Sequence, residues 1–63
     1  MKTGDKVRVL RRGKGWTQEQ LAEAIGYSKQ YISEIERGNK DCYPLLRKLA
    51  QALDVSYQKL LDD

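Results

Sequence analysis

A row of polar side chains occupies the middle of the sequence. Lys29, Gln30, Ser33, Glu34 and Arg37 recur at the spacing of one helix face. They offer an ammonium, a carboxamide, a hydroxyl, a carboxylate and a guanidinium, which are all hydrogen-bonding groups. No structural role requires Lys29 and Gln30 at the start of a short helix. The pattern therefore favours hydrogen-bonded recognition of another molecule over a merely solvated face.

The same residues offer little for catalysis. The chain contains no histidine, and its one cysteine, Cys42, has no base partner. Glu34 and Glu36 are two positions apart, so on a helix they face different directions and form no catalytic pair. The chain also lacks a ligand set for a structural zinc and cannot form an internal disulfide. We expect no enzyme, no metal, no cofactor and no small-molecule ligand.

Length and charge indicate a small basic protein. Its 63 residues predict one domain, 1–63, whose small core depends on efficient helix packing or on a partner. The net charge is +3, and in the first 14 residues Asp5 is the only acid among six basic residues. This distribution fits phosphate contact, although a solvated helix face has the same appearance. Without a membrane-length apolar run or a signal peptide, we expect a cytoplasmic protein with no membrane contact.

Short helices must position the polar row. Glycines, one proline and capping residues divide the chain into five helical pieces, without strand signals. The pieces are expected over roughly Thr3–Arg12, from Thr17 to Ile25, over Lys29–Arg37, from about Cys42 to Leu53, and from Ser56 onward.

The fourth piece follows a loop, "NKDCY", and its start is open to two interpretations. Asp41 or Cys42 caps it, and Pro44 falls in its first turn, where the missing amide hydrogen does no harm. Its expected apolar stripe consists of Tyr43, Leu46, Leu49, Ala50 and Leu53, with Leu45 at the edge.

The second and third pieces form a helix-turn-helix. Thr17 begins the first of these helices in a capping box, and Gly26 can adopt the left-handed conformation that ends it. Ser28 caps the next helix, and Ile32 holds that helix against the core. Ala22 is the small residue needed where the two helices cross. In such a motif the second helix can lie in the major groove of DNA.

The stretch "TQEQLAEAIGYSKQYISEIERG" resembles the phage-repressor and Cro-type (XRE-like) helix-turn-helix domains, and the likeness continues through "LRKLAQALDVSYQKLL". The resemblance implies an all-α, compact five-helix bundle of the lambda-repressor-like type, with the helix-turn-helix at helices 2–3. It also implies a transcriptional regulator that binds double-stranded DNA, mostly as a dimer on palindromic operators.

The resemblance assigns roles to the polar residues. Four of them match positions that face base edges: Lys29, Gln30, Ser33 and Glu34. Their chemistry suggests contacts with guanine for the lysine, adenine for Gln30 and cytosine for the glutamate.

A second set is expected to contact the DNA backbone. Gln18 matches the family glutamine that binds a phosphate and braces the recognition helix. The other candidates for phosphate contact are Arg37, Asn39, Lys40 and Tyr31. For the tyrosine, packing beside Ile32 is the alternative. Arg11 and Glu36 occupy positions that form a structural ion bridge in some members, so we assign them to the fold.

Two departures from the family pattern concern loops. The loop after Gly38 is one residue shorter than the common pattern and carries Asp41 where a proline is usual, which weakens the assignments of Asn39, Lys40 and Tyr43. Asp54 replaces the usual glycine after helix four, and aspartate tolerates the left-handed conformation less easily than glycine does.

The predicted function is that of a DNA-binding regulator, in the first place a repressor, whose homodimer forms on its own or only on DNA. The contact between protomers is expected near Val55, Tyr57 and Leu61. Alternatives within the fold are a control protein of a mobile element or restriction system and an antitoxin. A protein-interaction module that uses the surface of helix 3 is the alternative of another class.

Overall fold

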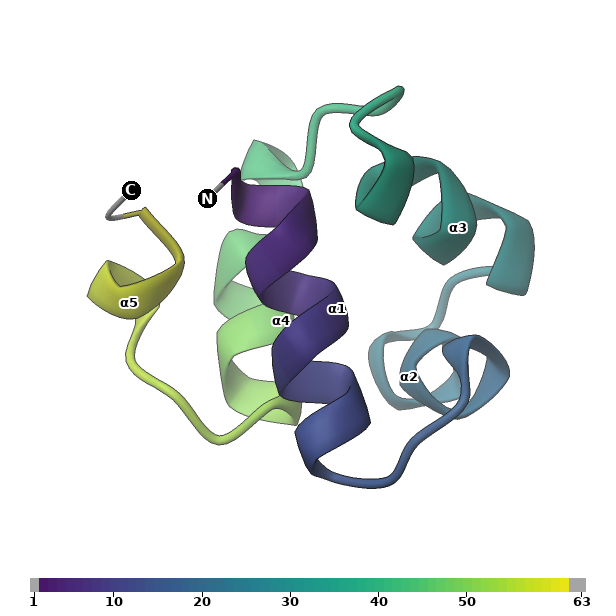
Figure 1. Cartoon of the computed structure of the whole chain (residues 1–63), viewed down its shortest axis with the longest axis horizontal. Helices are drawn as coiled ribbons and strands as arrows, with labels where there is room; N and C mark the ends of the chain where they lie inside the picture. Colours follow the sequence, from purple (N-terminus) through teal and green to yellow (C-terminus); the bar gives the residue numbers. More distant parts are fainter. Residues whose placement is uncertain (1, 62–63) are drawn as a thin grey trace.

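The computed structural model describes residues 2–61, whose regular elements are all helical (Figure 1). This confirms the predicted all-α five-helix bundle. The elements are α1 (Thr3–Gly13), α2 (Gln18–Ile25), α3 (Lys29–Arg37), the 3₁₀ turn η1 (Tyr43–Leu45), α4 (Leu46–Ala52) and α5 (Tyr57–Leu61). None of these helices is long and apolar enough to cross a membrane.

Helices α1 and α4 form the centre of the bundle. In Figure 1, α1 crosses in front of α4, with α2 and α3 on one side and α5 on the other. Helix α1 contacts α3 and α5, while α4 contacts α2 and α5. The helix-turn-helix therefore rests against the two central helices, which fix its orientation.

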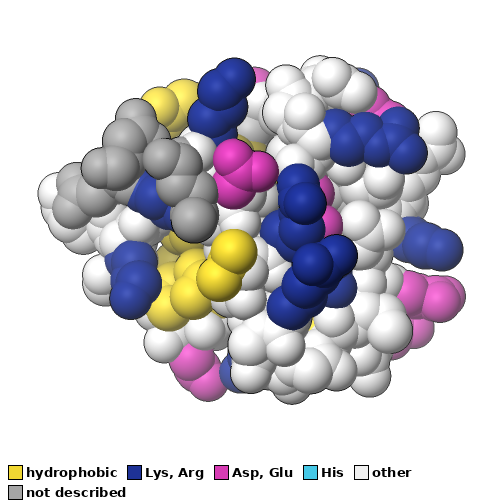
Figure 2. Space-filling view, in the orientation of Figure 1, with side chains coloured by type: hydrophobic (Ala, Val, Ile, Leu, Met, Phe, Trp, Pro, Cys, Tyr) yellow, Lys and Arg dark blue, Asp and Glu magenta, His cyan; other side chains and the backbone are white. Residues whose placement is uncertain are grey.

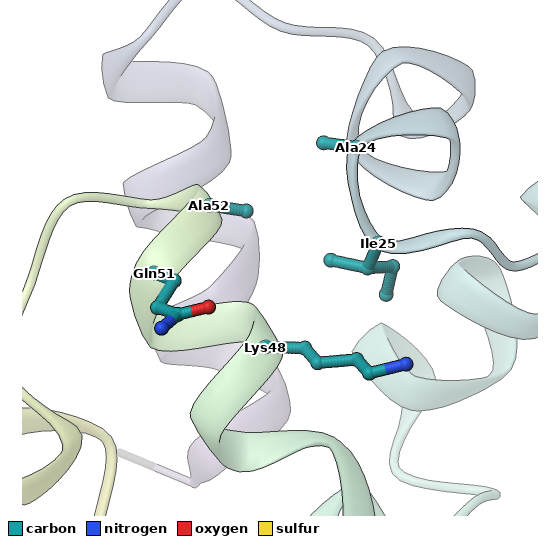
Figure 3. Close-up of a pocket in the computed structure, with 5 residues that line it drawn as sticks. All are labelled: Ala24, Ile25, Lys48, Gln51 and Ala52. Atoms are coloured by element: carbon teal, nitrogen blue, oxygen red, sulfur yellow. The ribbon is translucent and has the colours of Figure 1, made fainter.

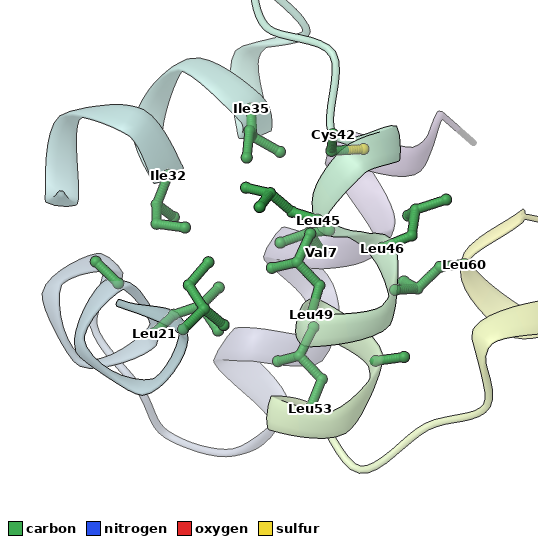
Figure 4. Close-up of a cluster of buried hydrophobic side chains, with 13 residues drawn as sticks. Val7, Leu21, Ile32, Ile35, Cys42, Leu45, Leu46, Leu49, Leu53 and Leu60 are labelled. Atoms are coloured by element: carbon green, nitrogen blue, oxygen red, sulfur yellow. The ribbon is translucent and has the colours of Figure 1, made fainter. Parts of the chain in front are cut away.

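Every helix contributes a fully buried side chain to one core. Val7, Leu21, Ile32, Leu49 and Leu60, taken from α1 to α5 in order, are each 0% exposed (Figure 4). Burial of such a side chain contributes about 1.5–3 kcal/mol relative to its exposed state. The shared core makes the position of α3 dependent on all the other helices.

The turn between α2 and α3 has the expected local chemistry. The Thr17 hydroxyl accepts a hydrogen bond from the Gln20 amide at 3.1 Å, and the Gln20 carboxamide oxygen accepts one from the Thr17 amide at 2.8 Å. Gly26 ends α2 in the left-handed region at φ 77°. The Ser28 hydroxyl then accepts from the Tyr31 amide at 3.1 Å and caps α3. Together these contacts set where α3 begins.

The start of α4 differs from the prediction. Tyr43, placed on the apolar stripe, is 64% exposed, whereas Leu45, placed at its edge, is 3% exposed. The reason is the 3₁₀ turn η1, which has about three residues per turn and so changes which side chains face the core. Of the two candidate caps, the Asp41 carboxylate accepts from the Tyr43 amide at 3.0 Å, while Cys42 makes no capping bond with its side chain.

A close backbone contact joins α1 to the end of α3. A Cβ atom built on Gly4 would overlap the carbonyl oxygen of Ile35 and lie 3.3 Å from that of Glu36. Only glycine allows α1 to approach the last turn of α3 this closely. This contact was not predicted, because it joins residues far apart in the sequence.

The connection from α4 to α5 contains a left-handed aspartate. Asp54 has φ 59°, and its carboxylate lies 3.2 Å from the Lys14 ammonium. Lys14 also lies over the Trp16 ring, 5.0 Å from its centroid. These contacts tie the loop after α1 to the loop after α4.

Candidate nucleic-acid interface

Helix α3 has one buried face and one polar face. Ile32 and Ile35 are 0% and 1% exposed, and they anchor the helix in the core. On the other face Lys29 and Gln30 are exposed, while Ser33 and Glu34 are half-buried. The first turn of α3 therefore projects its polar groups into solvent.

Lys29 and Gln30 have no partner among residues 2–61. None of the side-chain hydrogen bonds or ion pairs formed by these residues involves either side chain. A solvent-exposed ammonium and carboxamide keep all their donors and acceptors available to a ligand. These two side chains are free to bind an external molecule.

Glu36, at the other end of α3, is buried in a network of hydrogen bonds. Its carboxylate accepts from the Arg11 guanidinium at 2.7 and 3.2 Å and from the Gln18 carboxamide at 3.1 Å. Arg11 also donates to the carbonyl oxygen of Trp16 at 2.6 Å. A buried ion pair is tolerated when such hydrogen bonds satisfy both partners. The network joins α1, the start of α2 and the last turn of α3.

Gln18 stands at the first residue of α2, where backbone amides of the helix lack internal partners. Its carboxamide has two N–H donors, and one of them is used by Glu36. The second donor and the oxygen are available to a ligand at this end of α2. Its contact with Glu36 is a physical link between the α2 start and α3.

Glu34 lies between the exposed first turn of α3 and the buried Glu36 at its other end. Its carboxylate accepts from the Asn39 carboxamide at 3.2 Å and lies 3.7 Å from the Arg37 guanidinium. The structure thus brings one predicted base-contacting residue together with two predicted phosphate-contacting ones. This cluster was not predicted, because Asn39 reaches back over the turn at Gly38.

Two aromatic rings and a lysine lie in contact beside α3. Lys40 lies 5.9 Å from the Tyr31 ring centroid, and the Tyr31 and Tyr27 rings are 5.1 Å apart. Tyr31 is half-buried and packs against the core, as its alternative interpretation proposed. Lys40 and Tyr31 also line an open hollow together with Gln30. Lys40 therefore lies beside the first turn of α3.

A second hollow lies between α2 and α4 (Figure 3). Its walls are Ala24, Ile25 and Ala52, with Gln51 and Lys48 at the edge. Lys48 extends from α4 toward the turn after α2 and lies 5.7 Å from the Tyr27 ring centroid. One ammonium and one carboxamide supply neither a nucleophile with its base nor a carboxylate pair.

Burial affects the chemistry of Cys42. Burial raises the pKa of its thiol above the ordinary value of 9.0; a backbone hydrogen bond opposes this shift, and the charge of Asp41 adds to it. A raised pKa makes the thiolate scarce, so Cys42 is a poor nucleophile.

Comparison with known proteins identifies related sequences. A helix-turn-helix domain model matches residues 3–62. The HTH-type transcriptional regulator y4dJ of Sinorhizobium fredii is 44% identical over 59 residues, which cover 92% of this chain and 77% of that protein. SinR of Bacillus subtilis is 37% identical over 62 residues, which cover 95% of this chain but only 56% of SinR.

Solved structures share the same fold. The restriction-modification controller protein C.AhdI from Aeromonas hydrophila has a TM-score of 0.85 and 37% identity, over 92% of this chain and 86% of that one. SinR in complex with DNA has a TM-score of 0.84 and 37% identity, over 95% and 98% of the two chains. The P22 c2 repressor in complex with a synthetic operator has a TM-score of 0.84 and 27% identity, over 95% and 92%.

Proposed function

The chain belongs to the XRE-type helix-turn-helix family of DNA-binding transcriptional regulators, and we propose that it represses transcription as a homodimer on a palindromic operator read by α3. The family is one of regulators and not of enzymes. A cytoplasmic location forms part of the proposal, because a regulator must reach the DNA it controls. The chain spans about half of SinR, so nothing beyond the DNA-binding part is inferred from that protein.

The observation that carries this proposal is the unpartnered first turn of α3. Lys29 and Gln30 are exposed and unbound, whereas the opposite face of the same helix is fully buried. Polar groups held in fixed positions by a rigid helix suit the donor and acceptor pattern of the major groove. SinR and the P22 c2 repressor, which share the fold, have been crystallised with DNA.

The proposed contacts fall into two groups. Lys29, Gln30 and Ser33 contact base edges, with Glu34 accepting from cytosine through the part of its carboxylate not used by its neighbours. The backbone contacts come from Gln18, Arg37, Asn39, Lys40 and Tyr31. Phosphate contacts supply affinity that falls with salt, and base contacts supply specificity.

Selection of bound sites from random duplex DNA is the direct test. We expect one enriched sequence, and we expect Lys29→Ala and Gln30→Ala each to relax the choice at one or two base pairs. Lys48→Ala and Gln51→Ala remove the same functional groups from α4 and should leave the choice unchanged. If the unaltered protein enriches no sequence, the function is wrong and a protein-interaction module becomes the better explanation.

The proposed dimer uses the region of α5. Tyr57 is 39% exposed and lies under Arg47, 5.1 Å from guanidinium carbon to ring centroid, while Val55 and Leu61 are half-buried against the core. Two copies would place their α3 helices in major grooves roughly 34 Å apart. Sedimentation with and without operator tests this; a monomer that occupies one half-site under both conditions contradicts it.

The likeness to C.AhdI supports a second candidate, the control protein of a restriction-modification system. Both candidates bind an operator, so they differ in what the operator controls. A reporter gene placed behind the selected site distinguishes an output that is only repressed from one that is activated at low and repressed at high protein concentration.

A further inference from the structure

Four arginines surround a hollow where α1 meets the start of α2 and the end of α3. They are Arg8, Arg11, Arg12 and Arg37, and the hollow has a volume of about 350 Å³. Gln18 and Ser33 also line it. Figure 2 shows basic side chains gathered in the middle of this face, over α1. The patch is thus built by three helices and not by one.

The charge inside this hollow is strongly unbalanced. Glu36 is its only acidic lining residue, and that carboxylate is already bound by Arg11 and Gln18. Arg11 donates in turn to the Glu36 carboxylate and to the Trp16 carbonyl oxygen, so its charge is already paired. Arg8 lies 4.0 Å from the same carboxylate and donates to the Glu36 carbonyl oxygen at 3.3 Å. One buried negative charge therefore faces four arginines, and the hollow keeps a net positive charge.

The remaining arginines are held weakly or not at all. Among residues 2–61, Arg12 has no ion-pair partner. Arg8 pairs with Asp5 at 3.4 Å, and Arg37 pairs with Glu34 at 3.7 Å, both through side chains that are partly exposed to solvent. Exposed pairs of this kind are weak, so an incoming anion can replace the carboxylates.

We propose that Arg8 and Arg12, together with Arg37, bind a DNA phosphodiester beside the groove that α3 enters. Arg8 and Arg12 are four residues apart and so share one face of α1. Guanidinium groups bind phosphate oxygens through two parallel hydrogen bonds. This inference rests on the proposed function and adds a backbone contact from α1 to those of α2 and α3.

The test compares two arginines of equal charge on different faces. Arg12→Gln and the control Arg47→Gln are titrated with a duplex that carries one half-site, so that contact between protomers does not enter. Without Arg12, the slope of log K against log salt should become shallower by about 0.9. The ratio of the Kd of Arg12→Gln to the Kd of the unaltered protein should therefore fall roughly 3.5-fold between 50 and 200 mM salt. Arg47→Gln should keep the original slope, and both variants should keep the selected sequence.

Ethylation interference on the unaltered protein gives a second measurement that needs no variant. We expect interference at a phosphate that lies next to α1, and its loss in Arg12→Gln. Equal slopes for the two variants, or no such phosphate, overturn the inference and leave the proposed function intact. Failure of the unaltered protein to select any sequence overturns both.

Discussion

The two ends of α3 carry similar polar residues in opposite states. At the start, Lys29 and Gln30 are exposed and have no partner among the described residues. At the end, Glu36 is 5% exposed and accepts hydrogen bonds from Arg11 and Gln18. We call these the free end and the anchored end of the helix.

The difference separates two tasks of one helix. The anchored end fixes α3 against α1 and α2, which keeps the free end at a constant angle and depth. The free end can then vary its side chains at little risk to folding, since surface substitutions usually change stability by less than about 0.5 kcal/mol. A regulator can therefore change its operator without changing its fold.

Removal of Glu36 should have the largest effect on the anchored end. Glu36→Ala leaves the Arg11 guanidinium buried without a counter-charge, which should lower the free energy of unfolding by about 3–5 kcal/mol. Urea denaturation followed by circular dichroism measures this loss. Glu34→Ala removes a partly exposed pair and should lower the free energy of unfolding by less than about 1 kcal/mol.

If Glu36→Ala does not fold, a milder substitution at the same position still tests the prediction. Glu36→Gln keeps acceptors for Arg11 and should lie between the two alanine variants in stability. Equal stability of Glu36→Ala and Glu34→Ala would contradict the distinction between the ends.

The backbone contact at the anchored end predicts the next largest effect. Gly4→Ala places a Cβ atom against the Ile35 carbonyl oxygen, and because backbone cannot move aside easily, we expect about 1–3 kcal/mol of destabilisation. Gly13→Ala, in the last turn of the same helix with no atom nearby, should be neutral or stabilise by up to about 1 kcal/mol. The melting temperature of each variant measures the difference. Equal shifts for Gly4→Ala and Gly13→Ala would show that the fold does not depend on the close approach of α1 to the last turn of α3.

The free end should show the reverse pattern, with binding affected and stability unchanged. Lys29→Ala and Gln30→Ala should each leave the free energy of unfolding within about 0.5 kcal/mol of the unaltered protein. Each should reduce discrimination at its base pair by about 1–3 kcal/mol in competition between operator variants. A loss of stability comparable to that of Gly4→Ala would place these residues in the fold instead.

Sequence reasoning was most accurate where one residue decides a local conformation. Gly26 and Ser28 predict the turn before α3, because a left-handed backbone and a side-chain cap depend on neighbours only. It failed at Tyr43, because the 3₁₀ turn that exposes this ring depends on how α4 packs. It was silent on the approach of Gly4 to Ile35, which joins residues far apart in the chain.

The candidate site shows the same division. The polar row on α3 follows from helical spacing, and the placement of Arg11 and Glu36 came from the family resemblance. The link from Asn39 back to Glu34 and the hollow around Arg12 could not be predicted, since both depend on side-chain positions across a turn or between helices.

The smallest expected effect concerns Cys42, which lies in the core together with Ile35 (Figure 4). Its pKa is raised by burial, so the folded protein holds this proton more tightly than the unfolded chain does. The thiol therefore contributes full stability below the unfolded pKa near 9.0, and this contribution is lost as pH rises through the folded pKa. Other groups titrate in the same range, so the useful quantity is a difference: between pH 8 and pH 10 the free energy of unfolding should fall more steeply for the unaltered protein than for Cys42→Ala. Equal slopes would mean that the core beneath the anchored end admits solvent to the thiol, and the contrast between the two ends would then be one of side-chain contacts and not of burial.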